Sequence, residues 1–167
     1  MSFIKCTAYM LLVSLIFSCS NENKEVQKMQ TTIDSLQKQL HETYKPGFGE
    51  FMSGIQMHHA KLWFAGQNQN WPLADFEIHE IQEALEDIQN YCQDREETKS
   101  IGMINAPIDS LINSIQQKDL TGFKNNYILL TKTCNNCHLA TKHEFNIVTI
   151  PVSLPVVNQD FKTNHQN

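Results

Sequence analysis

Apolar residues recur at helical spacing along almost the whole chain. In the first such segment they lie three and four residues apart with polar residues between them, at Val26, Met29, Ile33, Leu36 and Leu40. This spacing predicts an amphipathic helix with a narrow apolar seam of two heptads, which ends near the turn signal at residues 44–47. The seam can pack on the body of the protein or pair with a second copy. We favour packing on the body, because two heptads are few for a stable coiled coil.

Two longer helices are expected next. Residues 48–66 place one apolar face on Phe48, Phe51, Met52, Ile55, His59, Leu62, Trp63 and Gly66. Asn70 is a plausible cap for the following helix, with Trp71 and Pro72 in its first turn. That helix carries an apolar stripe of Ala74, Ile78, Ile81, Leu85, Ile88 and Cys92. We expect its acidic residues, Glu77 among them, to form a solvated face and His79 to be exposed, while Cys92 acts as a small apolar filler.

The last two stripes complete a set of four helices. Isoleucines and Leu111 mark a helix over residues 101–115, in which Pro107 predicts either a kink or a fresh helix start. Asp119 then caps a final helix whose stripe is Phe123, Tyr127, Leu130, Cys134, Cys137 and His138. Beyond it, residues 147–157 are rich in β-branched side chains and broken by prolines, which predicts an extended strap. The predicted fold class is all-α: a four-helix bundle-like domain with an additional N-terminal helix and an extended C-terminal strap.

Size and charge bound the function. The chain has 167 residues and a formal net charge of −5, enough length for one domain with one core. Nucleic acid is an unexpected partner, because phosphate binding requires a basic face. We interpret the moderate acidity mainly as a source of solubility.

Residues 134–138 read Cys-Asn-Asn-Cys-His, the attachment signature of c-type haem. Two thiols one helical turn apart can add to the two vinyl groups of one porphyrin, and the imidazole of His138 can then bind the iron. The alternatives are a thioredoxin-like dithiol and half of a zinc site. The first lacks a βαβ context, and the second lacks another cysteine pair. We therefore predict one covalent haem c on Cys134 and Cys137, with His138 as the proximal iron ligand.

The amino-terminal segment indicates export. Residues 1–18 contain a single charged side chain, Lys5, and an apolar run from Ala8 to Phe17 that suits a signal peptide. The stretch Leu15-Ile16-Phe17-Ser18-Cys19 resembles a bacterial lipobox, although Phe17 is bulkier than the usual residue. The resemblance implies cleavage before Cys19 and lipidation of Cys19, which would anchor the protein on the periplasmic side of a membrane. The alternatives are an ordinary signal peptide and an uncleaved anchor.

The predicted domain organisation follows from these features. Residues 1–18 form a lipoprotein signal peptide, residues 19–47 a tether with the amphipathic helix, and residues 48–167 the helical haem domain. For the sixth iron position the first candidate is His59, in the middle of an apolar face. Met52 lies on the same face two turns earlier, and an open, five-coordinate iron is the third alternative.

The position of the motif in the last helix resembles the class II cytochromes c, the cytochrome c′-like four-helix bundles. The resemblance covers about residues 48–140. It is specific at Cys134, Cys137 and His138 and architectural elsewhere; the extra helix and the strap depart from the pattern. The stretches Lys61–Gly66 and Asn70–Ala74 are also similar to a poorly characterised group of bacterial monohaem cytochrome lipoproteins.

Three functions fit these features. The first is electron transfer by a lipid-anchored monohaem cytochrome with a redox partner protein. The second is gas binding or sensing at a five-coordinate haem, and the third is a haem-bearing scaffold subunit of a larger redox complex. An enzyme is less expected, since no acid–base pair is evident beside the motif. A homo-oligomer is compatible with the amphipathic helix.

Overall fold

The computed structural model describes residues 24–40 and 46–162, and the chain divides into two compact units between residues 45 and 46. In the first unit, residues 24–40 are helical throughout, as their apolar spacing predicts. All five seam side chains are exposed, with exposed fractions between 47% and 70%. They take no part in the hydrophobic core, whose members all come from the second unit.

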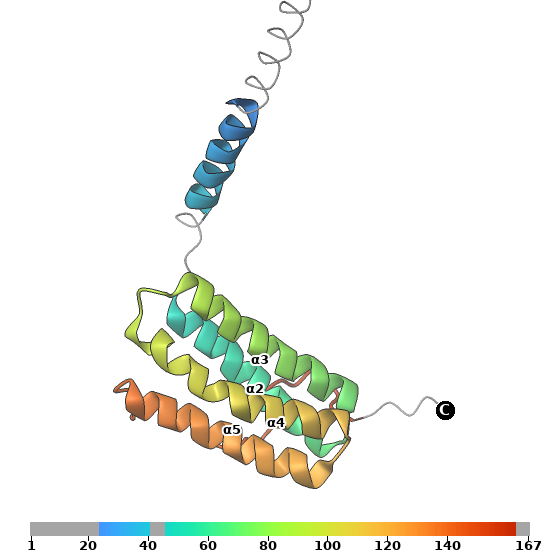
Figure 1. Cartoon of the computed structure of the whole chain (residues 1–167). Helices are drawn as coiled ribbons and strands as arrows, with labels where there is room; N and C mark the ends of the chain where they lie inside the picture. Colours follow the sequence, from blue (N-terminus) through green and yellow to red (C-terminus); the bar gives the residue numbers. More distant parts are fainter. Residues whose placement is uncertain (1–23, 41–45, 163–167) are drawn as a thin grey trace, which may run out of the picture. The chain divides into compact units, whose positions relative to one another are not determined.

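The second unit is built from four α-helices that pack side by side (Figure 1). They are α2 (Phe48–Gln67), α3 (Trp71–Tyr91), α4 (Asn105–Gln116) and α5 (Leu120–Ala140), and the 3₁₀ helix η1 (Glu96–Ile104) precedes α4. Helix α2 packs on α3 and α5, and α4 packs on the same two helices. Residues 24–40 and 46–162 contain no strand, so the all-α prediction is confirmed for the described part of the chain.

The helix starts follow local chemistry. The side chain of Asn70 accepts a hydrogen bond from the backbone N–H of Leu73 at 3.4 Å, and that of Asp119 accepts one from the N–H of Thr121 at 3.0 Å. Both predicted caps are therefore confirmed. Helix α4 begins at Asn105, which puts Pro107 in the first turn. The missing N–H of a proline has no intrahelical partner to lose there, so Pro107 marks a fresh start and not a kink.

The core follows the predicted stripes. Its largest fully buried side chains are Tyr127 and Phe123 on α5. Trp63 of α2 stacks on the ring of Phe123 and lies tilted against that of Tyr127. Cys92 is 4% exposed and belongs to this core, which confirms its role as an apolar filler. Isoleucines of α3, η1 and α4 close the centre of the bundle, and the larger part of the apolar area that drives folding is buried here.

Glu77 corrects the prediction of a fully solvated acidic face on α3, because its exposed fraction is 0%. The nearby residues Ala74 and Ile78 belong to the buried stripe, so the packing of α3 on α2 takes Glu77 inside as well. His58 Nδ1 donates to Glu77 Oε2 at 2.7 Å, and Lys61 Nζ lies 3.9 Å from Oε1. Within the described residues Oε1 has no hydrogen-bond partner. Polar side chains of α2, His58 and Lys61, thus accompany an acidic residue that periodicity alone assigns to solvent. His79 is exposed, as expected.

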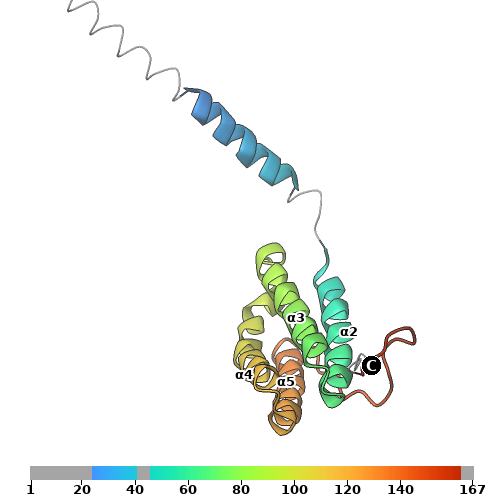
Figure 2. The same cartoon turned by 90° about the vertical axis from the view of Figure 1, so that its right-hand side faces the viewer.

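After α5 the chain continues without helix or strand as far as residue 162 (Figure 2, red). Its far end is held by Phe161, which is 3% exposed and packs against the ring of Phe64 at 5.8 Å between centroids. Asn70 also donates to the carbonyl of Lys162 at 3.2 Å. These contacts confirm the strap as a segment lying on the bundle. Its near end, close to the Cys-Asn-Asn-Cys-His motif, helps to form the functional site.

Candidate functional site

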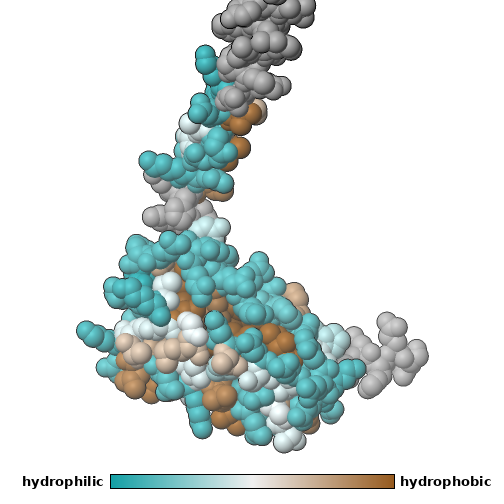
Figure 3. All heavy atoms as spheres, in the orientation of Figure 1, coloured by the Kyte–Doolittle hydropathy of each residue, from teal (hydrophilic) through white to brown (hydrophobic). Residues whose placement is uncertain are grey.

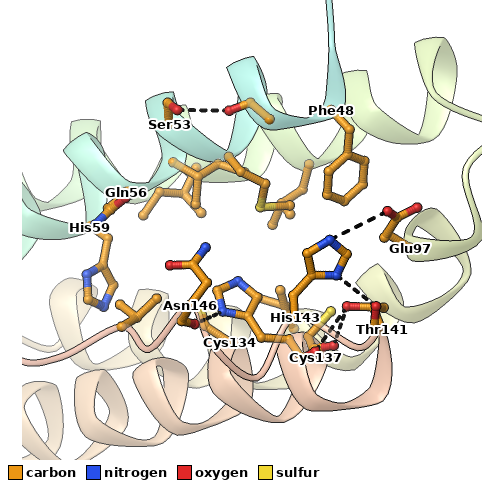
Figure 4. A pocket seen from close by; sticks show the side chains of 18 of the residues that line it. Phe48, Ser53, Gln56, His59, Glu97, Cys134, Cys137, Thr141, His143 and Asn146 are labelled. Atoms are coloured by element: carbon orange, nitrogen blue, oxygen red, sulfur yellow. Dashed lines mark hydrogen bonds and ion pairs between the residues drawn. The ribbon is translucent and has the colours of Figure 1, made fainter.

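A pocket of about 280 Å³ lies between α2 and α5, and the two cysteines and the histidine of the motif all line it (Figure 4). This volume is near the lower end of typical ligand pockets, ~300–1,000 Å³. In the figure, Phe48 of α2 extends into the space between that helix and α5, which carries Cys134 and Cys137. The other side chains that line the pocket are mostly apolar, with contributions from α3, η1 and the strap, and include Met52, Ile55, Ile81, Leu85, Ile104 and Leu130. The site combines an apolar cavity with a few convergent donor atoms.

The two motif cysteines share this cavity. Cys134 and Cys137 are one turn apart on α5, both line the pocket and both carry free thiols. Burial raises the pKa of Cys134 to about 11, and it raises the pKa of Cys137 as well. Both thiols are therefore protonated near neutral pH. A thioredoxin-like dithiol depends on a lowered thiol pKa, so this environment does not favour that alternative.

His138 has one engaged and one available ring nitrogen. Its Nδ1 lies 2.5 Å from the backbone carbonyl oxygen of Asn146. A carbonyl can only accept, so Nδ1 carries the hydrogen, and Nε2 of a neutral ring then carries the lone pair. His138 lines the pocket. Histidine ligands of metals commonly show this arrangement, in which a hydrogen bond from the second nitrogen fixes tautomer and ring orientation.

Asn135 holds in place the segment that supplies this carbonyl. Its side-chain amide donates to the carbonyl of Val148 at 2.9 Å, and its side-chain oxygen accepts from the N–H of Val148 at 2.8 Å. The strap is thus clamped to α5 by a two-point contact two residues beyond Asn146. In the sequence, Asn135 only occupies one of the two positions between the cysteines. The polar character of that spacer is a weak signal, because the partner is a backbone that no side-chain pattern reveals.

His59 is 4% exposed and has partners at both ring nitrogens. Thr131 donates its hydroxyl to the carbonyl of Tyr127 at 2.9 Å, so its oxygen is left to accept from His59 Nε2, also at 2.9 Å. The hydroxyl of Tyr127 lies 2.9 Å from His59 Nδ1 and 2.7 Å from the His59 carbonyl oxygen, so these two acceptors share its single hydrogen. Burial lowers the pKa of His59 to about 4, so the ring is neutral at pH 7.

The structure thus brings His59, Cys134, Cys137 and His138 to one pocket, together with Met52. His59 differs from His138 in one chemical respect. A metal could bind His59 Nε2 only in place of the hydrogen bond to Thr131, whereas Nε2 of His138 needs no such exchange. Cys19 and the predicted leader lie outside the described residues.

One end of the pocket is charged, which sequence reasoning did not associate with the site. Arg95 donates to Glu97 at 2.8 and 3.2 Å, and His143 Nε2 lies 4.0 Å from the same carboxylate. The bond to Arg95 lowers the pKa of Glu97. In Figure 4, Glu97 and His143 lie together at this end and His59 lies at the other. The sequence shows residues 94–97 only as a charged corner, and the fold places two of them on the pocket wall.

Comparison with protein-family models, with curated protein sequences and with solved structures gives no match. Among residues 24–40 and 46–162, no group of three or more His, Cys, Asp or Glu side chains is arranged to hold a bare metal ion. A porphyrin differs, because it brings four nitrogen ligands of its own and asks the protein for one or two. In the same residues, no helix is both long and apolar enough to cross a bilayer.

Proposed function

We propose that this chain is a monohaem c-type cytochrome that carries electrons outside the cytoplasmic membrane. The observation that carries the proposal is the hydrogen bond from His138 Nδ1 to the Asn146 carbonyl. This bond leaves the lone pair of Nε2 available for iron, beside two free thiols. The apolar pocket adjoining these groups is the second support. The presence of the motif in the last helix of a bundle agrees with the resemblance to class II cytochromes c.

The residues have distinct tasks in this proposal. Cys134 and Cys137 hold the haem through thioethers, and His138 binds its iron through Nε2. The bound haem supplies reversible one-electron exchange. The apolar side chains around it exclude water, and the engaged Nδ1 of His138 raises the basicity of Nε2 and so favours the oxidised iron.

The sixth position has two candidate ligands on α2. His59 is the first, provided that its Nε2 gives up the hydrogen bond to Thr131 and binds iron instead. The alternative is Met52, which lines the same pocket. If iron binds neither, the haem is five-coordinate and the protein binds gases. The complete engagement of both His59 nitrogens is the observation that favours this second function.

Absorption spectra of the purified protein in both oxidation states test the proposal. We expect a c-type haem spectrum, low-spin in the electron carrier. His59→Ala turns it high-spin if His59 is the ligand, and Met52→Ala does so if Met52 is. A high-spin spectrum in the unaltered protein, with carbon monoxide binding to the reduced form, selects gas binding. A colourless protein from a host with the haem-attachment machinery contradicts both functions.

Covalent attachment has its own test. The double variant Cys134→Ala/Cys137→Ala is expected to lose the haem stain on a denaturing gel, while Cys92→Ala, which alters a buried cysteine of the core, keeps it. Stain that persists in the double variant contradicts attachment at the motif.

Membrane anchoring through lipidated Cys19 is part of the same proposal and rests on the lipobox-like sequence. Cys19→Ser is expected to move the protein from the membrane fraction to the soluble fraction, because two or three acyl chains are needed for a stable anchor. Unchanged membrane partitioning contradicts it.

A further inference from the structure

The helix of residues 24–40 carries its large apolar side chains in one narrow seam. Its five seam side chains are 47–70% exposed, and Figure 3 shows apolar spheres along one side of this helix beside hydrophilic ones. The hydrophobic core contains none of the seam residues. A run of exposed large apolar side chains on one face of a helix indicates a surface that another helix covers.

The width of the seam identifies the kind of partner. The apolar positions follow the strict 3-4-3-4 pattern of heptad positions a and d, and the other positions of the helix are polar: Val26, Ile33 and Leu40 at a, Met29 and Leu36 at d. A helix that lies on a globular body or a membrane surface carries a broader apolar face, with e or g positions included. A seam limited to a and d matches one or more helices of the same kind in a coiled coil.

The residues beside the seam permit two identical copies to pair. The flanking e and g positions are Gln30 and Gln37, and Glu25, Thr32 and Gln39. In a parallel pair each g residue faces the following e residue of the other helix, so Glu25 meets Gln30 and Thr32 meets Gln37. No like charges meet at these positions, so self-pairing carries none of the repulsion that specifies hetero-pairs. β-Branched Val26 and Ile33 at a, with Leu36 at d, favour a parallel coiled coil of two helices.

We propose that residues 24–40 pair with the same helix of a second copy in a parallel, two-stranded coiled coil. The site is distinct from the haem pocket, and the inference rests on the proposed function only for the membrane anchor that brings two copies together. Two heptads form a weak coiled coil alone. Attachment of both chains to one membrane would raise their effective concentration and favour the parallel orientation.

Cysteine cross-linking of the full chain in membranes tests the proposal. Leu36→Cys places a thiol in the seam, facing its counterpart, whereas Ser35→Cys places one at the outward c position of the same turn. Bridging requires the two Cα atoms to lie within about 7 Å with converging side chains. Under mild oxidation we expect Leu36→Cys to appear mainly as a disulfide-linked dimer on a non-reducing gel. Ser35→Cys should stay at the level of the unaltered chain, whose own cysteines set the baseline.

Three outcomes overturn the proposal: equal cross-linking of both variants, which reports random collision; no cross-linking of either; or a Leu36→Cys adduct with a different protein. A second measurement avoids reliance on the added thiol. Ile33→Asp puts a charge in the seam and is expected to abolish the dimer in sedimentation of the detergent-solubilised full chain, while Ser35→Asp leaves it intact. A dimer that survives Ile33→Asp, or a monomeric unaltered chain, likewise refutes pairing through this seam.

Discussion

Replacement of Asn135 by alanine tests whether the strap is needed to orient His138. The change removes both hydrogen bonds between Asn135 and the backbone of Val148. Each bond contributes about 1 kcal/mol net, and the half-buried backbone groups of Val148 regain water only in part, so we expect a loss of about 1–3 kcal/mol. For a domain of this size that lowers Tm by about 4–12 °C. The spacing of the two cysteines is unaltered.

Asn136→Ala is the matched control, because Asn136 occupies the other spacer position and is exposed. Both substitutions exchange asparagine for alanine in helix α5, so the gain in helix propensity cancels in the comparison. Thermal unfolding followed by circular dichroism measures the difference in stability. Equal Tm values for the two variants would refute the clamp.

A second readout reports on His138 itself. Without the clamp, the Asn146 carbonyl is no longer held against Nδ1, so the ring loses the bond that fixes its tautomer. In the haem-loaded protein we expect the reduction potential to rise, because the imidazole becomes a weaker donor to the oxidised iron. A potential that is unchanged while Tm falls would show that the clamp stabilises the strap without tuning His138.

Further predictions concern the packing of α2 on α5. A Cβ on Gly66 would overlap the ring of Phe123, so Gly66→Ala should destabilise the fold by about 1–3 kcal/mol, whereas Gly54→Ala, with open space around it, should stabilise by up to about 1 kcal/mol in chemical denaturation. Tyr127→Phe removes the one hydroxyl hydrogen that His59 Nδ1 and the His59 carbonyl share, and should cost about 1–3 kcal/mol in the same assay; unchanged stability would contradict the network. Because burial lowers the pKa of His59 from 6.5 to about 4, the unfolded chain binds a proton between these pH values that the folded chain does not. Stability of the haem-free protein should therefore fall by up to about 3 kcal/mol as the pH drops from 6.5 to 4, and His59→Gln should flatten that part of the profile.

The helices could be predicted from the sequence because their signals are local. Apolar spacing placed the four stripes, and the side chains of Asn70 and Asp119 marked two helix starts that the structure confirms. Pro107 predicts a kink or a fresh helix start, and its position in the first turn of α4 shows that a helix starts there. Each of these features depends on residues within one or two turns of the chain.

Contacts between separate elements could not be predicted from the local sequence, as three residues show: Glu77, Asn135 and Arg95. Periodicity assigns Glu77 to the polar side of α3, yet its burial depends on His58 and Lys61 of another helix. Asn135 contacts a backbone segment 13 residues away in a strap with no regular structure. Arg95 reaches the pocket because the chain between α3 and η1 turns toward it. Such pairings follow from how elements pack, which no single stripe encodes.

The two histidines of the pocket differ in a way that a sequence cannot express. Both lie on apolar helix faces; the motif predicts His138 as the proximal iron ligand, whereas periodicity makes His59 only a candidate for the sixth position. His138 has one nitrogen held by a backbone carbonyl and the other free, while His59 has both held by side chains of α5. Thr131 and Tyr127, which hold His59, lie one and two turns before the attachment motif on the same helix. Ligation by His59 would therefore replace its hydrogen bond to Thr131 on the helix that carries the cysteines, whereas ligation by Met52 would leave that bond in place. The spin states of His59→Ala and Met52→Ala therefore identify more than the sixth ligand. They also show whether His59 keeps its hydrogen bonds to Thr131 and Tyr127 in the haem-loaded protein or gives up the bond to Thr131 to bind iron.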